Sequence, residues 1–189
     1  YGAGSLMVQV EQTPDGYSAS EIFKTGPKEW LASEQQTPIL RDGLLYGIMP
    51  KDGGALKQQF VCYSPDGTEP VWSSGKTHRF GLGPYLLADE KFYVLDDDGT
   101  LTMISYSTTG YEQLAQHKVL EGHDAWGPIA LAGTRMLLRD SKTMICIEVG
   151  VTPDLGGIPR GSGSFVSVAG PAVEYILSSG STFLAGAEQ

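Results

Sequence analysis

The sequence predicts an all-β protein, a β-propeller of four-stranded blades with about three and a half blades in this chain of 189 residues. A Pro followed by an apolar stretch recurs at Pro38, Pro84 and Pro128, in steps of 46 and 44 residues. Apolar residues alternate or cluster in short runs, and helical periodicity is weak. A unit of four short strands that returns at this period is typical of a propeller blade.

Each of these prolines opens a predicted hairpin of two strands. The turns fall at residues 41–43, 88–91 and 132–134, between apolar runs such as the one that contains Tyr46 and the one that contains Tyr93. Asp-Gly, as in Asp42-Gly43, suits a two-residue hairpin because both central positions need positive φ. We expect Tyr46 and Tyr93, which occupy matching positions, to lie in the core.

A third strand follows in each unit, at residues 57–64, 101–108 and 143–150. Aligning Cys62, Ile104 and Cys146 gives two steps of 42 residues. Turn signals follow the first two of these strands, and the N-terminal stretch repeats the pattern around residues 14–16. We therefore expect a blade part at residues 1–28 and blades at about 35–75, 81–121 and 125–150.

The C-terminal part is less regular. Residues 151–164 are rich in Gly, Pro and Ser and predict a linker or long loop. Residues 165–189 stay unassigned, with further strands as one alternative: Pro171 lies 43 residues after Pro128 and suggests another strand start. The other alternative is a separate segment beyond the propeller.

Closure of the ring needs more than this chain provides. Propellers close with 4–8 blades, and an open one leaves unpaired sheet faces and edges. We expect remaining blades or a partner chain to complete it. The chain begins with Tyr1 instead of Met, which suggests a processed product or a fragment.

Composition excludes several classes of protein. The chain has 22 acidic against 13 basic residues and a net charge of −9, which argues against nucleic acid as a partner. No window approaches the roughly 18 apolar residues of a membrane span. Asparagine is absent, so there is no N-glycosylation acceptor.

Cys62 and Cys146 lie two blades apart in this register, and we expect two separate core thiols, since a disulfide needs Cα atoms within about 7 Å.

The repeats resemble the pyrroloquinoline-quinone-like (PQQ-like) β-propeller repeat proteins of bacteria. The resemblance rests on the stretches TPILRDGLLYG, FVCYSPDGTEPVW, GLGPYLLADEKFYVLDDDGTL and HDAWGPIALAGTRMLLRDSKTMICIEV. It implies that Trp72, after Asp66-Gly67, packs against the neighbouring blade. It also implies a periplasmic or secreted protein, either a quinoprotein dehydrogenase or a non-catalytic scaffold.

The catalytic pattern of the dehydrogenases of this family has no counterpart here. They hold Ca²⁺ with Glu, Asn and Asp oxygens and place a vicinal Cys-Cys disulfide over the quinone, whereas this chain has no Asn and no Cys-Cys pair. PQQ with Ca²⁺ would bind only if missing blades supplied the ligands. We predict no catalytic residue and no metal ligand. The Asp96-Asp97-Asp98-Gly99 run lacks calcium-loop spacing and predicts a hairpin turn.

A ligand site is predicted at one mouth of the propeller channel. Loops that enter the innermost strands of successive blades surround such a mouth, and here they carry polar and aromatic side chains. An arginine could hold an anion, a histidine could move a proton, and a tryptophan could stack on a flat ligand. The alternative is that these side chains cap strand ends. The candidates are Glu34, Gln35, Gln36, His78, Arg79, His123, Asp124 and Trp126.

Three functions follow as hypotheses. The favoured one is an extracytoplasmic, non-catalytic propeller module that binds a small molecule or protein at the channel mouth. The second is a fragment of a PQQ-dependent dehydrogenase that oxidises alcohols or sugars. The third is a scaffold in an envelope protein assembly.

Overall fold

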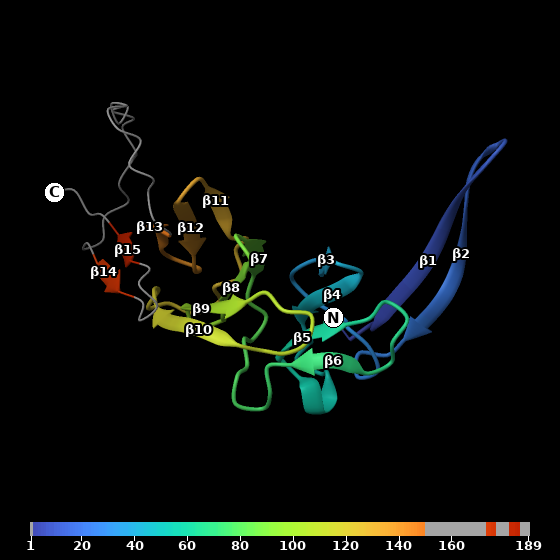
Figure 1. The fold of residues 1–189 in the computed structure, drawn as a ribbon, viewed down its shortest axis with the longest axis horizontal. Helices are drawn as coiled ribbons and strands as arrows, with labels where there is room; N and C mark the ends of the chain where they lie inside the picture. Colours follow the sequence, from blue (N-terminus) through green and yellow to red (C-terminus); the bar gives the residue numbers. More distant parts are fainter. Residues whose placement is uncertain (1, 150–172, 177–181, 186–189) are drawn as a thin grey trace.

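The structure is a computed structural model that describes residues 2–149, 173–176 and 182–185. These residues form an all-β fold of four antiparallel sheets, and the described part contains one short 3-10 helix, Gly54–Leu56, but no α-helix. The sheets follow one another along the chain, and the N-terminal hairpin projects from one end (Figure 1). Within the described residues, no helix is long and apolar enough to cross a bilayer.

Each sheet is built from strands that are close in the sequence. Sheet A is the hairpin of β1 (Ser5–Thr13) and β2 (Gly16–Thr25). Sheet B contains β3 (Ile39–Arg41), β4 (Leu44–Ile48), β5 (Phe60–Tyr63) and β6 (Pro70–Ser73) in that spatial order. Sheet C contains β7 (Tyr85–Ala88), β8 (Lys91–Leu95), β9 (Thr100–Ser105) and β10 (Gln113–Lys118), also in order.

Sheet D departs from the predicted unit. Its first three strands are β11 (Ala130–Ala132), β12 (Arg135–Arg139) and β13 (Met144–Glu148). The outer strands come from beyond residue 164: β13 pairs with β15 (Thr182–Ala185), which pairs with β14 (Val173–Ile176). The stretch after Pro171 therefore extends the sheet of residues 130–148 and does not begin a new one. The predicted linker at 151–164 lies outside the described residues.

The predicted hairpin turns are confirmed. Asp42 and Gly43 have φ of 50° and 75°, and Asp89 and Glu90 have φ of 48° and 57°. Both turns thus place two consecutive residues at positive φ, the conformation that matches the right-handed twist of the flanking strands. The Asp96–Gly99 run forms the turn between β8 and β9, also as predicted.

The strand register corrects one alignment made from the sequence. Tyr46 pairs with Cys62, Tyr93 with Met103, and Leu137 with Cys146. Cys62 and Cys146 are therefore equivalent to Met103, not to Ile104. A shift of one residue turns a side chain to the opposite face of the sheet, and Ile104 indeed pairs with Phe92 on that other face.

Apolar side chains fill the space between successive sheets. Tyr46, Cys62 and Trp72 of sheet B pack with Phe92 and Ile104 of sheet C, among others, in one buried cluster. A second cluster joins sheets C and D, and a third joins sheet B to the hairpin. Tyr46 and Tyr93 are buried, as predicted.

Trp72 contacts the neighbouring sheet, as the sequence motif implies. Its Nε1 donates a hydrogen bond to the Ser107 carbonyl, 3.1 Å away in the β9–β10 loop, and its ring lies 6.4 Å from that of Tyr111. Both cysteines are free thiols, as predicted, but only Cys62 is buried. Cys146 is exposed, on a face of sheet D that no segment of the described part of the chain covers.

Candidate functional site

The loops that enter β3, β7 and β11 are hydrogen-bonded to the connections between second and third strands. Glu34 Oε2 accepts from the backbone N–H of Lys51, 3.3 Å away in the β4–β5 connection. Asp97, in the β8–β9 turn, accepts from the N–H of Leu82 at 2.6 Å. Asp140, which follows β12, accepts a hydrogen bond at 3.1 Å from the N–H of Gly122, in the loop that enters β11. The entry loops thus lie at the same edge of the sheets as these connections, which we call the loop edge.

A small hollow lies at the loop edge between sheets B and C. Its lining is partly apolar and includes the predicted segment Glu34-Gln35-Gln36. These are three of the eight predicted site residues, consecutive in one loop, and the other five do not line the hollow. The lining residues are Ser33, Glu34, Gln35, Gln36, Ile48, Met49, Leu82, Gly83 and Tyr85.

Tyr85 connects the two sides of this hollow. Its hydroxyl lies 3.3 Å from Ser33 Oγ and within 3.4 Å of the carbonyls of Gln36 and Thr37. Burial raises the pKa of the Tyr85 phenol, and the hydrogen bond with Ser33 only partly opposes this. Tyr85 therefore stays a neutral hydrogen-bond donor at any physiological pH and holds the 33–37 loop against β7.

Gly47 in β4 makes this close approach possible. A Cβ at position 47 would lie 2.7 Å from Ser33 Oγ and 2.9 Å from the Tyr85 hydroxyl. Ser33 Oγ also donates to the Ile48 carbonyl at 3.1 Å. The absence of a side chain at Gly47 thus lets Ser33 and Tyr85 meet over the strand.

Glu34 carries an unused acceptor beside the hollow. Its Oε2 accepts from Lys51, whereas Oε1 is buried and has no hydrogen-bond partner within the described residues. A buried carboxylate oxygen without a donor is costly, because the desolvation of the charge is not offset. A ligand with an N–H or O–H group would satisfy it.

His78 and Arg79 form hydrogen bonds with backbone carbonyls close to them, next to sheet B. His78 Nδ1 lies 3.1 Å from the Ser74 carbonyl, and its ring packs 5.3 Å from that of Tyr111. Arg79 donates from Nε to the Lys76 carbonyl at 3.2 Å and from Nη1 to the Lys57 carbonyl. Neither side chain lines the hollow, and both contribute bonds that stabilise loops.

The loop that enters β11 contributes one residue towards sheet C. Trp126 Nε1 donates to Asp97 Oδ1 at 2.8 Å, and the same oxygen accepts from Leu82 N–H. Asp97 therefore joins two successive entry loops next to the hollow. His123 and Asp124 instead form an exposed pair, with Nδ1 and Oδ2 2.8 Å apart.

Two other carboxylates of the β8–β9 turn have opposite pKa shifts. Burial, together with the neighbouring Asp98, raises the pKa of Asp96 to about 7. The pKa of Asp98 falls to about 2, chiefly through its hydrogen bond with Asp96 and aided by Thr100 and Lys118. Asp96 Oδ1 accepts from the N–H groups of Thr100 and Asp98 at 2.8 and 3.2 Å, so this pair shapes the turn.

Sequence reasoning missed Ser33, Tyr85 and Asp97. Tyr85 directly follows Pro84, which marks the strand start, whereas the predicted site residues all precede such a proline. Asp97 was assigned to the turn as a whole. A signal was therefore present for both residues, whereas nothing in the sequence distinguishes Ser33 from other loop serines.

Comparison with known proteins adds no relative. No family model matches the chain, and no curated protein does.

The described residues contain no group of three or more His, Cys, Asp or Glu side chains that could hold a metal ion.

Proposed function

We propose that sheets A to D are consecutive blades of a PQQ-like β-propeller. The support is the succession of antiparallel sheets of two, four, four and five strands in chain order, with an apolar cluster between each sheet and the next. This is the arrangement expected when a unit that cannot bury its faces alone stacks on its neighbours. The loop edge then corresponds to the channel mouth.

We further propose that this propeller module is non-catalytic and binds a ligand at the hollow of the loop edge. The observation that carries the proposal is the buried Oε1 of Glu34, which has no hydrogen-bond partner within the described residues. Glu34 lines the same hollow as the neutral Tyr85. The carboxylate favours a donor, and a cationic one most of all. The ligand is accordingly a molecule or protein segment that places one ammonium or hydroxyl group in the hollow, which has room for about one water-sized group.

The two alternative functions have less support. A PQQ-dependent dehydrogenase needs several oxygen ligands for Ca²⁺, and the described residues do not fit that group because they offer no such cluster. A scaffold role would use exposed sheet faces and not the hollow. The extracytoplasmic location rests on the family resemblance alone.

Binding of defined probes tests the proposal. The probes are butylamine, a lysine-containing tripeptide and glucose, followed by ligand-observed NMR and calorimetry. We expect the amines to bind and Glu34→Gln to weaken them about tenfold, as loss of one charge-assisted hydrogen bond implies. The matched control is Glu112→Gln, because Glu112 is an exposed glutamate in the β9–β10 loop. This variant should bind the amines normally.

Two outcomes would contradict this function. If none of the probes binds, or if Glu34→Gln and Glu112→Gln bind equally well, the hollow is not the site. Tight binding of PQQ in the presence of Ca²⁺, with reduction of a dye by alcohols or sugars, would favour the dehydrogenase instead.

A further inference from the structure

The loops that enter β7 and β11 can be compared residue by residue. Leu86 of β7 is equivalent to Ala130 of β11, because each pairs with the same position of the strand that follows it. Four residues earlier stand Leu82 in one loop and Trp126 in the other, and each is followed by Gly-Pro. Trp126 is therefore the counterpart of Leu82 in the next sheet.

Between sheets C and D this position carries a hydrogen-bond donor. Trp126 Nε1, in the loop that enters sheet D, donates to Asp97 Oδ1 in the β8–β9 turn of sheet C at 2.8 Å. The backbone N–H of the neighbouring Ala125 donates to the Asp97 carbonyl at 3.3 Å and fixes the loop on the turn. An indole N–H from the next sheet thus satisfies the carboxylate of Asp97.

Between sheets B and C the same position carries no donor. Leu82 is aliphatic and lines the hollow. The carboxylate beside it is that of Glu34, whose Oε2 accepts from the N–H of Lys51. Its Oε1 is buried and has no hydrogen-bond partner in the part of the chain that the structure describes. This junction thus lacks a donor of the kind that Trp126 supplies at the next one.

Glu34 and Asp97 are comparable because each carboxylate links the entry loop of its own sheet to the connection between that sheet's second and third strands. Glu34 lies in the entry loop of sheet B and accepts from Lys51 in the connection. Asp97 lies in the connection of sheet C and accepts from Leu82 in the entry loop, at 2.6 Å. The two junctions therefore differ in whether the next sheet adds a second donor to this carboxylate.

We propose, on the basis of the ligand-binding function above, that the side chain at position 82 determines which ligands reach Glu34. The donor of the ligand binds Glu34 as Trp126 binds Asp97. Leu82 holds the position that the indole ring has in the next junction, and the hollow has room for about one water-sized group. A donor carried on a ring is therefore excluded. The ammonium at the end of an unbranched alkyl chain, such as a lysine side chain, fits and forms a charge-assisted hydrogen bond.

Substitutions of Leu82 test the selectivity by calorimetry. Leu82→Trp should weaken butylamine binding at least about tenfold, because the larger side chain fills the hollow. Leu82→Met is the matched control of similar volume and should bind butylamine as the wild-type chain does. Leu82→Ala should bind indole, which the wild-type chain should not, because the shorter side chain leaves room for a ring. Circular dichroism checks that each variant keeps the fold.

The reverse change makes the second junction resemble the first. Trp126→Leu removes the indole donor from Asp97, at a side chain that is 40 % exposed, so the fold should persist. We expect this variant to bind one more equivalent of butylamine than the wild-type chain does. Adding Asp97→Asn should abolish the extra binding. Adding Glu121→Gln instead, at an exposed glutamate of the loop that enters β11, should leave it intact.

The outcomes separate this selectivity from the binding function itself. Unchanged butylamine affinity in Leu82→Trp, or no extra equivalent in Trp126→Leu, would overturn the role of this position. The binding function would still stand in that case if Glu34→Gln weakened butylamine. Butylamine binding by Trp126→Leu but not by the wild-type chain would refute the function at the hollow, yet support the control of the junction by this position.

Discussion

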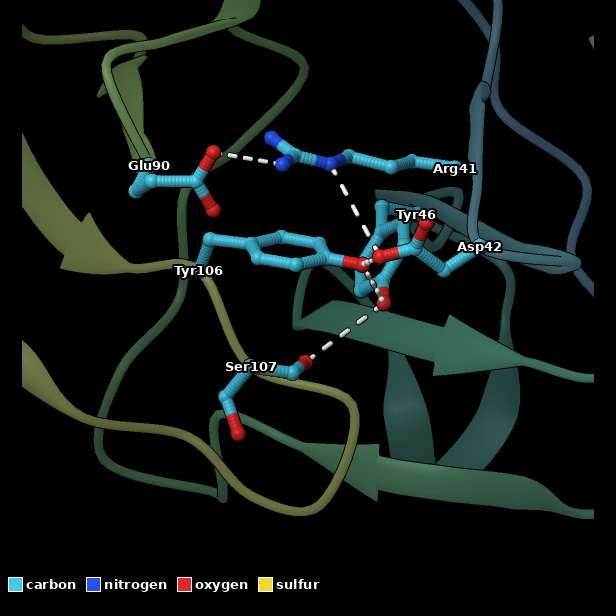
Figure 2. Close-up of polar contacts among 6 residues, drawn as sticks. All are labelled: Arg41, Asp42, Tyr46, Glu90, Tyr106 and Ser107. Atoms are coloured by element: carbon cyan, nitrogen blue, oxygen red, sulfur yellow. Dashed lines mark hydrogen bonds and ion pairs between the residues drawn. The ribbon is translucent and has the colours of Figure 1, made fainter.

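The guanidinium of Arg41 lies 4.1 Å above the ring of Tyr106 and pairs with Glu90 at 2.5 Å, so one side chain of sheet B contacts two elements of sheet C (Figure 2). The Tyr106 hydroxyl in turn donates to Asp42 Oδ2 at 2.5 Å. Tyr46 Oη lies 3.5 Å from both the Tyr106 hydroxyl and the Ser107 carbonyl. A polar network thus continues the apolar contact between the two sheets.

Tyr106→Phe should lower the free energy of unfolding by about 1 kcal/mol, because it leaves Asp42 without its phenolic donor while the ring contact with Arg41 persists. Urea unfolding checks this value. Tyr17→Phe, at an exposed tyrosine of the hairpin, is the control and should have no measurable effect. An equal effect of both changes would mean that the Tyr106 hydroxyl contributes nothing.

The two buried tryptophans should respond differently to replacement by phenylalanine. Trp72 Nε1 donates to Ser107, whereas the buried Nε1 of Trp30 has no partner within the described residues. Trp72→Phe should therefore destabilise the protein by about 1 kcal/mol more than Trp30→Phe, since both lose similar volume but only one loses a hydrogen bond. Equal unfolding midpoints for the two variants in urea would contradict this.

Asp96 should make stability fall as pH rises from about 4 to 7. Burial raises its pKa to about 7 in the folded state, above the ordinary value near 3.8, so the folded protein holds this proton more tightly than the unfolded one. The stabilisation is complete below the unfolded pKa and is lost as pH passes the folded pKa. Asp96→Asn should be less sensitive to pH in this interval, by about 1–2 kcal/mol after allowance for its partial exposure.

Asp140 provides the control of opposite sign. Burial alone would raise its pKa, but hydrogen bonds from the N–H groups of Lys142, Thr143 and Gly122 outweigh this and lower it. Its contribution is present above the ordinary pKa and lost as pH falls. Asp140→Asn should therefore not reduce the loss of stability between pH 4 and 7. If Asp96→Asn and Asp140→Asn gave parallel pH profiles, the assignment of the effect to Asp96 would be wrong.

Gly47→Ala should disturb the hollow directly. The new methyl group would lie under 3 Å from Ser33 Oγ and the Tyr85 hydroxyl, and we expect a loss of about 1–3 kcal/mol in stability together with loss of probe binding. Gly110→Ala is the matched control, because a Cβ there meets nothing within 4 Å. Thermal unfolding and the amine-binding assay measure both variants. Normal amine binding by Gly47→Ala would show that the Ser33–Tyr85 contact is not needed.

Part of the candidate site could be predicted because it lies next to a repeated landmark. Glu34, Gln35 and Gln36 lie just before Pro38, which opens a unit, and these three residues line the hollow. The same landmark gave His78 and Arg79, whose side chains bond to nearby backbone carbonyls. Position relative to a strand start does not determine where a side chain turns, because local carbonyls compete for the same donors.

The sequence by itself determined the all-β class, the hairpins and the succession of strands in sheets B and C, because turn residues at positive φ and alternating apolar residues act over a few positions. Tertiary structure decided what depends on distant partners. Strand pairing set Met103, not Ile104, beside Tyr93, and strands from residues 173–185 completed the sheet begun at Ala130. It also brought Tyr85 to Ser33 across Gly47, since a contact between segments some 50 residues apart arises only when two sheets pack together.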